Sequence, residues 1–220
     1  MSGYYNEKLS AEKLKQCYDA ADERIRQYLT AEINFVISHL KPNDIVLELG
    51  CGFGRVIKQL QPHCRLTIGI DTAFSSLKLA QESGQLIALM DASNQGFRDN
   101  SFDHVICIQN GLSAFQVDRL QLIEESLRIT KPGGLVLFST YAEKFWPHRL
   151  RWFEEQSHRG LLGEIDYDKT GDGVIICKDG FRSDTISPNE FNSLASQCDC
   201  SFELEEVDQS SLFCILTKNS

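Results

Sequence analysis

The chain has 220 residues, of which 42% are hydrophobic and 24% charged, and its formal net charge is −9. This length suits one domain with a sizeable core. The acidic balance, with a pI near 5.1, disfavours proteins that grip phosphate backbones through basic patches, so we expect small or cationic substrates and no nucleic-acid partner. The sequence carries no signal peptide and no apolar run long enough to cross a bilayer, which predicts a soluble, cytoplasmic protein with no membrane partner.

The cysteines indicate reduced thiols rather than a disulfide framework, because no C-x-x-C occurs and most lie within apolar segments. The pair Cys198 and Cys200 could suggest a metal site, but no nearby histidine completes a ligand set, and we predict no metal. The eight cysteines are Cys17, Cys51, Cys64, Cys107, Cys177, Cys198, Cys200 and Cys214.

Two helices are expected before the first strand. Ser10 is placed to cap the first of them, which carries Leu14 and Tyr18 on one side. The second has apolar residues at helical spacing from position 29 to position 40, and Pro42 ends it. Aromatic residues of this N-terminal layer are candidates for contact with a ligand.

A strand, a tight turn and a helix start are predicted around three glycines at alternate positions, Gly50, Gly52 and Gly54. The absent side chains would let a nucleotide-like ligand lie against the backbone. A dinucleotide fingerprint needs a further glycine where this chain has Arg55. The carboxylate of Glu48 would repel a pyrophosphate and attract a ligand that carries ammonium or sulfonium charge.

Four further strands are predicted at residues 65–71, 85–91, 105–109 and 135–140, with helical segments between them. The alternation indicates right-handed crossovers in a doubly wound, mostly parallel α/β sheet. Asp71 ends the first of these strands, where such folds present a carboxylate to the hydroxyls of a ribose. The nearly continuous apolar run at 85–91 predicts a strand buried on both faces.

The C-terminal half adds elements that a minimal parallel sheet lacks. Residues 141–160 are rich in aromatic, histidine and arginine side chains, which suggests a cap. Turn signals within 161–184 predict a small antiparallel excursion. A capping box at 187–190 predicts a helix, and the segments 202–207 and 212–218 predict a terminal hairpin.

Three motifs carry a family resemblance that covers roughly residues 40–141. They are Glu48-x-Gly50-x-Gly52-x-Gly54, FRDNSFD at 97–103 and LRITKPGG at 127–134. Together with Asp71, they resemble the signatures of class I S-adenosylmethionine-dependent methyltransferases that act on small molecules.

The resemblance implies a Rossmann-like, mostly parallel seven-stranded sheet that ends in an antiparallel hairpin. A single methyltransferase domain, residues 1–220, would then comprise a helical cap at 1–41, a cofactor-binding core at 42–141, an inserted cap with a small β excursion at 142–186, and a C-terminal helix and hairpin at 187–220. It also implies S-adenosylmethionine as cofactor and S-adenosylhomocysteine as product. The acceptor would be a small molecule, and the protein a monomer or homodimer.

The resemblance also implies roles for particular residues. The glycine turn would approach the methionine part of the cofactor, the end of the second strand would bind the ribose, the end of the third would read the adenine, and the end of the fourth would reach the sulfonium. The implied cofactor residues are Glu48, Gly50, Cys51, Gly52, Asp71, Thr72, Asp91, Ala92, Gln109 and Asn110.

A protonated oxygen or nitrogen nucleophile needs a base, whereas a thiolate or a carbanion-like carbon does not. The candidate bases are Tyr141, His148 and His158. We expect the acceptor to lie between the N-terminal helices and residues 141–159. Its candidate contacts are Tyr18, Tyr28, Tyr141 and Trp146.

Two other functions remain possible from the sequence. One is an NAD(P)-dependent reductase, which Arg55 and the terminal hairpin disfavour. The other is a regulatory module that binds S-adenosylmethionine without transferring its methyl group. Residues 109–112 lack the Asn-Pro-Pro-aromatic tetrad that similar enzymes use on nucleobase or amide nitrogens, which lowers the case for nucleic-acid N-methylation.

Overall fold

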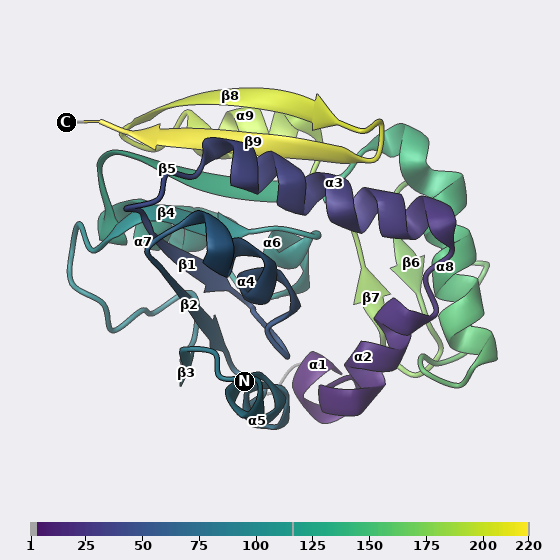
Figure 1. Ribbon diagram of the computed structural model, residues 1–220. Helices are drawn as coiled ribbons and strands as arrows, with labels where there is room; N and C mark the ends of the chain where they lie inside the picture. The colour runs from purple at the N-terminus through teal and green to yellow at the C-terminus, as the bar shows by residue number, and fades with distance from the viewer. Residues whose placement is uncertain (1–3, 116, 220) are drawn as a thin grey trace.

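A computed structural model describes residues 4–115 and 117–219 of the chain (Figure 1). Its main sheet has seven strands in the order β3-β2-β1-β4-β5-β9-β8, and the first five run parallel. The last two add antiparallel strands at one edge, so the predicted fold class is confirmed. The strands are β1 (Ile45–Leu49), β2 (Leu66–Asp71), β3 (Ile87–Leu89), β4 (Phe102–Cys107), β5 (Thr130–Tyr141), β8 (Cys200–Val207) and β9 (Ser211–Lys218).

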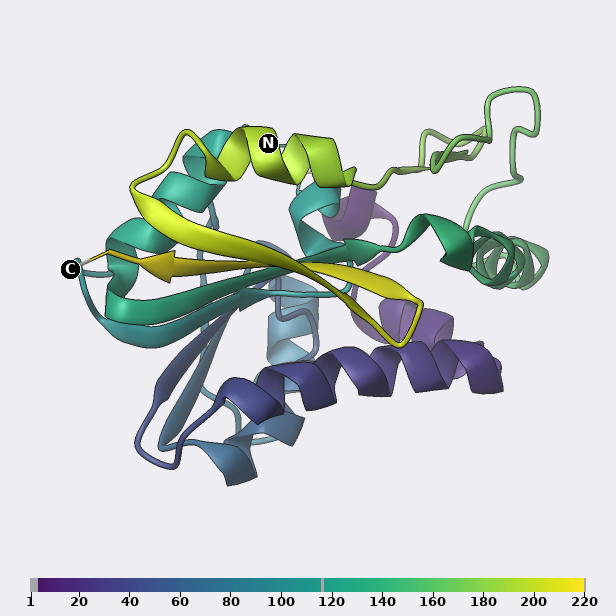
Figure 2. The same cartoon turned by 90° about the horizontal axis from the view of Figure 1, so that it is seen from above.

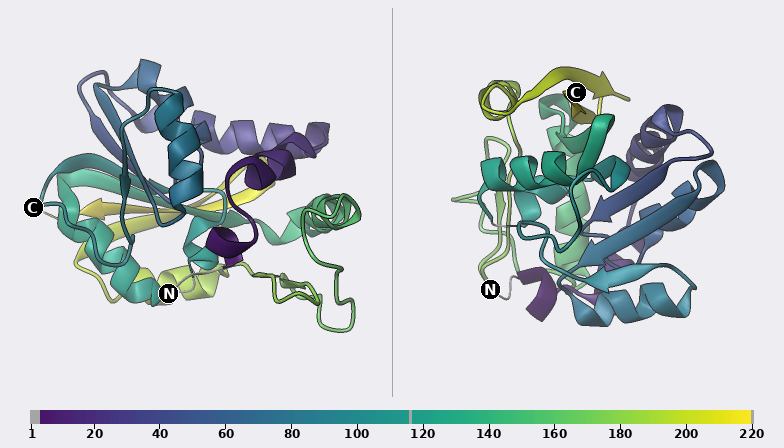
Figure 3. Two further views of the ribbon diagram at one scale, coloured as in Figure 1. Left: turned by 90° about the horizontal axis from the view of Figure 1, so that it is seen from below. Right: turned by 90° about the vertical axis from the view of Figure 1, so that its left-hand side faces the viewer.

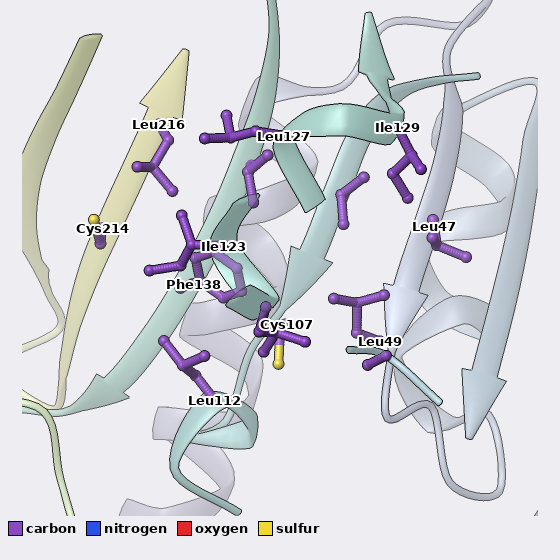
Figure 4. Close-up of a cluster of buried hydrophobic side chains, with 14 of the residues drawn as sticks. Leu47, Leu49, Cys107, Leu112, Ile123, Leu127, Ile129, Phe138, Cys214 and Leu216 are labelled. Carbon is purple, nitrogen blue, oxygen red and sulfur yellow. The ribbon is translucent and has the colours of Figure 1, made fainter. Parts of the chain in front are cut away.

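Helices cover both faces of this sheet (Figure 2). Successive residues of a strand point to opposite faces, so Val46 packs against α3 and α4, whereas Leu47 belongs to the cluster that α7 and α9 complete. Figure 4 shows Ile123 and Leu127 of α7 directed at the strands in this second cluster. These helices are α3 (Glu23–His39), α4 (Arg55–Leu60), α5 (Phe74–Glu82), α6 (Gly111–Ala114), α7 (Arg119–Ile129) and α9 (Pro188–Ala195).

The prediction of a strand buried on both faces at 85–91 is wrong. β3 has three residues and pairs only with β2, so it forms the edge of the sheet. Leu89 is 60% exposed at this edge. The apolar run therefore marks a short edge strand and not a central one.

Two further helices, α1 (Tyr4–Glu7) and α2 (Ala11–Asp19), precede α3, and α2 lies beside α5 (Figures 1 and 3). Ser10 holds the N-cap position of α2 but makes no capping hydrogen bond. The amide of Ala11 instead donates to the hydroxyl of Ser76, and the hydroxyl of Ser75 donates to that of Ser10. Asp22 caps the N-terminus of α3, where its carboxylate accepts a hydrogen bond from the Ile25 amide at 2.9 Å.

The segment after β5 forms a helix, which the sequence analysis did not predict, and then the small antiparallel pair that it did predict. These are α8 (Trp146–His158), preceded by the 3₁₀ turn η2 (Glu143–Phe145), and the strands β6 (Ile175–Ile176) and β7 (Arg182–Ser183). Arg149 is 1% exposed and donates to the carbonyl oxygens of Gly173 and Ser183, which ties α8 to this excursion.

A second hydrophobic core, separate from the two faces of the sheet, joins this segment to the N-terminal helices. We call it the aromatic core. Its members come from α2, α3, the end of β5, η2, α8 and the excursion. Several are large rings: Tyr28, Tyr141, Phe145, Trp152, Phe153 and Phe181.

The C-terminal predictions are confirmed in detail. The hydroxyl of Ser187 accepts from the amide of Glu190 at 3.2 Å, which is one half of the predicted capping box of α9, whereas the Glu190 carboxylate accepts from Arg119. β8 and β9 form the hairpin, and Asp208 and Gln209 at its turn both adopt positive φ.

All eight cysteines are free thiols, and five of them are buried. The residues that the structure describes include no group of three or more metal-ligating side chains. Within the same residues, no helix is both long and apolar enough to pass through a membrane.

Candidate active site

A cavity of about 560 Å³ lies at the carboxyl ends of β1, β2 and β4, and residues of α1 and α2 close one side of it. Figures 1 and 3 show these two short helices beside the ends of the strands. Doubly wound sheets bind ligands at this edge. All of the predicted cofactor residues except Asn110 line the cavity.

The glycine turn forms one wall and needs its glycines. Gly50, Gly52 and Gly54 have φ values of 72°, 52° and 80°, which other residues rarely adopt. A Cβ atom on Gly50 would lie 2.6 Å from the ring of Phe115, and one on Gly54 would lie 1.5 Å from the side chain of Gln85. Gly50 and Gly52 therefore bring backbone without a side chain to the cavity, beside Cys51 and Phe53.

Asp71 is held at the end of β2 with its carboxylate in this cavity. One oxygen accepts from the Gly52 amide at 2.8 Å, and the other accepts from the Ala73 amide at 2.7 Å. Burial raises the pKa of Asp71, and these amide hydrogen bonds oppose the rise. Because a carboxylate oxygen accepts more than one hydrogen bond, the fixed Asp71 can still take both hydroxyls of a ribose.

Glu48 differs from the charged group that the sequence suggested. It is buried, and burial raises its pKa to about 8, which leaves the carboxyl mostly protonated near neutral pH. Its Oε2 lies 3.2 Å from the amide of Ile57, at the start of α4. Glu48 therefore acts first as a brace between β1 and α4, which shapes the glycine turn.

Gln109 and Asn110 follow β4 in the left-handed conformation, with φ values of 59° and 65°. Gln109 lines the cavity. The side chain of Asn110 is buried outside it, where it accepts from Thr140 and donates to the carbonyl oxygen of Asp184, each at 2.8 Å. Asn110 therefore fixes the chain after β4 from outside the cavity wall, and any contact with the cofactor stays a prediction.

Glu32 is a site residue that our sequence reasoning missed. It is fully buried on α3, where it accepts from the Gln109 amide at 2.7 Å and from the hydroxyls of Ser139 and Ser211. Burial raises its pKa to about 7. Its position was a usable signal, because residue 32 falls on the same helix face as the apolar residues 29, 33 and 36.

Arg55 and Tyr18 also meet at Gln109, on the side of the cavity that α2 covers. The guanidinium of Arg55 lies 4.6 Å from the centre of the Tyr18 ring and donates from Nη2 to Oε1 of Gln109. The Tyr18 hydroxyl donates to the same oxygen at 3.4 Å. Sequence reasoning used Arg55 only as evidence against a dinucleotide, and missed that its side chain lines the cavity.

Comparison with known proteins identifies the family. Residues 47–138 match a family model described as a methyltransferase domain. A tRNA (carboxymethyluridine(34)-5-O)-methyltransferase from Arabidopsis thaliana is 33% identical over 48% of this chain and 26% of the relative. The N-methyltransferase NodS from Bradyrhizobium japonicum, solved with S-adenosyl-L-homocysteine, has the same fold, with a TM-score of 0.60, 16% identity and coverage of 90% and 89% of the two chains. Residues 47–138 therefore form a methyltransferase domain, with the fold of the class I S-adenosylmethionine-dependent methyltransferases.

These relatives correct the predicted partners of the methyltransferase. The Arabidopsis protein and three mammalian relatives are named as tRNA methyltransferases, so the prediction of a small-molecule acceptor with no nucleic-acid partner is wrong. The prediction of no nucleic-acid partner relied on the net charge, which averages over the whole surface and does not describe any one part of it. Another relative, a malonyl-[acyl-carrier protein] O-methyltransferase from Marinomonas, is 28% identical over 84% of this chain and 66% of the relative. The chain spans only about a quarter to a third of the tRNA methyltransferases that it matches.

The residues around the cavity fit the family's cofactor. Its volume lies within the range of sites that enclose a drug-sized ligand. Asp71 offers a ribose acceptor, the glycine turn offers bare backbone to the methionine part, and Asp91 with Ala92 lines the cavity beyond the end of β3. S-Adenosylmethionine is therefore the cofactor that this site suits, while the role of each residue stays a prediction.

The remaining candidates lie apart from the cavity. Tyr28 is fully buried, with its ring 5.2 Å from those of Tyr141 and Phe145. His148 stacks on Phe145 at 5.4 Å, His158 is exposed at the end of α8, and the partly buried Trp146 packs on the aromatic core. Of the predicted acceptor contacts, only Tyr18 lines the cavity, and no residue of 141–159 does so among those described. The N-terminal helices and residues 141–159 meet through packed rings, so the structure offers no support for an acceptor between them.

Proposed function

We propose that this protein binds S-adenosylmethionine and transfers its methyl group to an oxygen atom of an acceptor that enters beside α2. The observation that carries the proposal is the cavity in which the glycine turn faces the carboxylate of Asp71. The names of the Arabidopsis and Marinomonas relatives, which both specify O-methylation, support oxygen as the acceptor atom.

The protein's contribution would be position and exclusion of water. S-Adenosylmethionine, when bound, supplies an electrophilic methyl group on a sulfonium. Asp71 and the glycine turn would hold the two ends of the cofactor, and Leu9, Leu14 and Tyr18 would cover the side where the acceptor enters. Alignment of the reacting atoms and removal of water together account for most of the rate in such displacements.

The cavity limits only the part of the acceptor that reaches the methyl group. The reacting group is therefore small or terminal, whatever molecule carries it. Both tRNA and acyl-carrier-protein methyltransferases stand among the relatives, so the carrier has to be found by experiment.

The first test uses the cofactor alone. S-Adenosylhomocysteine should raise the melting temperature of the full chain, whereas NADH and NADPH should leave it unchanged. The reverse pattern would favour a reductase. Transfer of a labelled methyl group to total tRNA or to a metabolite extract then separates an enzyme from a regulatory module, since a module binds the cofactor but labels neither.

A further inference from the structure

We propose that Glu32 of α3 is a positioning residue for methyl transfer, which acts through Gln109 on the side of the cavity where the acceptor enters. This inference rests on the proposed function, and it adds a residue that lies outside the matched methyltransferase domain.

The chain bends sharply where it leaves β4 at the cavity. Gln109 and Asn110 have φ values of 59° and 65°, although neither is a glycine. This left-handed conformation costs free energy for residues with a side chain, and it persists only where the surroundings enforce it. Asp208 and Gln209 share the conformation because they form a hairpin turn, but no hairpin follows β4. The bend at Gln109 therefore needs its own support, and its place beside the cavity points to function.

Glu32 supplies this support. Its Oε2 accepts from the Gln109 amide at 2.7 Å and from the Ser139 hydroxyl at 2.9 Å. The same hydroxyl also accepts from the Gln109 amide, at 2.8 Å, so Glu32 orients the second acceptor as well. Its Oε1 accepts from the hydroxyl of Ser211 at 2.6 Å. One carboxyl group thus ties α3, β5 and β9 to the bend that follows β4.

A carboxyl group is a poor choice at this position if its role is packing alone. Glu32 is fully buried, and the residues on the same helix face, Leu29, Ile33 and Val36, are apolar members of hydrophobic clusters. Burial of a carboxyl group costs free energy that an apolar side chain of similar volume avoids. Neither α3 nor β9 lies within residues 47–138, which match the family model. The network therefore supports the cavity wall from outside that domain.

Gln109 transmits this support to the entrance side of the cavity. Its Oε1 accepts from Nη2 of Arg55 and, at 3.4 Å, from the hydroxyl of Tyr18. Both partners line the cavity, and Tyr18 belongs to α2, beside which the proposed acceptor enters. Asp71 has separate hydrogen bonds, to the amides of Gly52 and Ala73. Displacement of Gln109 should therefore disturb alignment of the acceptor more than binding of the cofactor.

The main test is Glu32→Met, because methionine fills a similar space but offers no oxygen to the Gln109 amide. The full-length variant is incubated with S-adenosylmethionine labelled in the methyl group and, in parallel arms, with total tRNA and with a metabolite extract. In an arm that the original protein labels, the initial rate should fall at least about tenfold, while the dissociation constant of S-adenosylhomocysteine stays within about threefold. Glu32→Gln keeps a side-chain oxygen and should restore the rate to within about threefold.

Val36→Ala is the matched control, since Val36 is equally buried on the same helix but belongs to a hydrophobic cluster. It should lower stability and leave the rate of the folded protein within about twofold. Equal losses of rate in Val36→Ala and Glu32→Met would reduce Glu32 to a packing residue and overturn the proposal.

A double variant tests whether Glu32 acts through Gln109. Gln109→Ala should lower the rate as Glu32→Met does, and the two changes together should cost no more than either alone, because both act at one point. A full rate in Gln109→Ala, or losses that multiply in the double variant, would overturn the proposal.

Hydrogen exchange decides whether Glu32 holds the bend even if neither arm is labelled, an outcome that would count against the proposed methyl transfer itself. Exchange of the Gln109 amide is measured by NMR relative to that of Val105, which is buried within β4. It should be at least about tenfold faster in Glu32→Met than in the original protein, and within about threefold in Glu32→Gln. Glu32→Asp, whose carboxylate is too short to reach the amide, replaces Glu32→Met in every test if that variant does not fold. Unchanged protection of Gln109 would overturn the proposal.

Discussion

Two regions of this methyltransferase concentrate aromatic and ionisable side chains, and they are built for different purposes. In the cavity, polar groups are aimed at open space from a glycine turn and from strand ends. In the aromatic core, the rings of Tyr28, Tyr141 and Phe145 pack against one another. The guanidinium of Arg149 donates hydrogen bonds to backbone carbonyl oxygens. Residue type alone does not separate the two regions. What separates them is that one lies where parallel strands end and the other lies beyond that edge.

The difference explains why the histidines and tyrosines of residues 141–159 looked like catalytic candidates. The guanidinium of Arg149 in fact packs on the ring of Tyr141, 4.5 Å from the ring centre. A dense aromatic segment after a strand is compatible with a cap over a ligand or with a second core. Only the packing partners decide between them, and these come from α2 and α3, more than 100 positions earlier in the chain.

The largest expected effect is a loss of stability in the aromatic core, and it tests whether this core only packs or also binds the cofactor. Phe145 is 1% exposed, so Phe145→Ala should lower the free energy of unfolding by about 3–5 kcal/mol in urea denaturation. The folded variant should still bind S-adenosylhomocysteine within about threefold of the original affinity. Phe74→Ala is the matched control, because Phe74 is 70% exposed and should change stability by less than about 0.5 kcal/mol. A selective loss of cofactor binding in Phe145→Ala would show that the aromatic core and the cavity form one site.

The second prediction concerns Glu32, which links α3 to the wall of the cavity. Its pKa is about 7 in the folded protein against a usual value of 4.5, so between these pH values the folded state keeps a proton that the unfolded chain loses. This contribution to stability is therefore complete below about pH 4.5, decreases as the pH rises, and is lost above about pH 7, with a total of about 3 kcal/mol. Urea unfolding at a series of pH values measures it.

The matched variant Glu32→Gln should remove that part of the fall in stability. A decline due to Glu48 remains, since the buried Glu48 also has a raised pKa, of about 8. If the pH dependence of Glu32→Gln matched that of the original protein, Glu32 would be ionised at all of these pH values, and the cost assigned to its burial would be wrong.

Much of the fold and part of the site could be predicted because their signals are local. Alternating strands and helices, the capping box at Ser187 and the terminal hairpin each depend on a few neighbouring residues. The glycine turn and Asp71 were found for the same reason. Tyr18 and Gln109 were predicted as site residues one by one, but their contact with Arg55 was not, because the three residues come from distant elements and meet only through hydrogen bonds and a ring contact. The edge position of β3 could not be predicted from the sequence either, because an apolar run does not indicate which strands pair with it.

The smallest expected effect tests the sequence-derived bases directly. Tyr141→Phe and His158→Ala should each leave methyl transfer to an identified acceptor within about twofold, because neither side chain lines the cavity. Initial rates with labelled cofactor, measured from pH 6 to pH 9, provide the comparison. A rate that fell a hundredfold in either variant, with an altered pH profile, would show that residues 141–159 take part in the reaction.

The central claim is that the cavity beside Asp71 holds the cofactor, and calorimetry tests it most directly. S-Adenosylhomocysteine is titrated into the original protein, Asp71→Ala and the control Asp99→Ala, whose carboxylate is exposed on the surface. The loss of two charge-assisted hydrogen bonds should weaken binding to Asp71→Ala by about 2–4 kcal/mol, roughly 30- to 1000-fold, while Asp99→Ala binds as the original does. Unchanged affinity in a folded Asp71→Ala protein would contradict the claim.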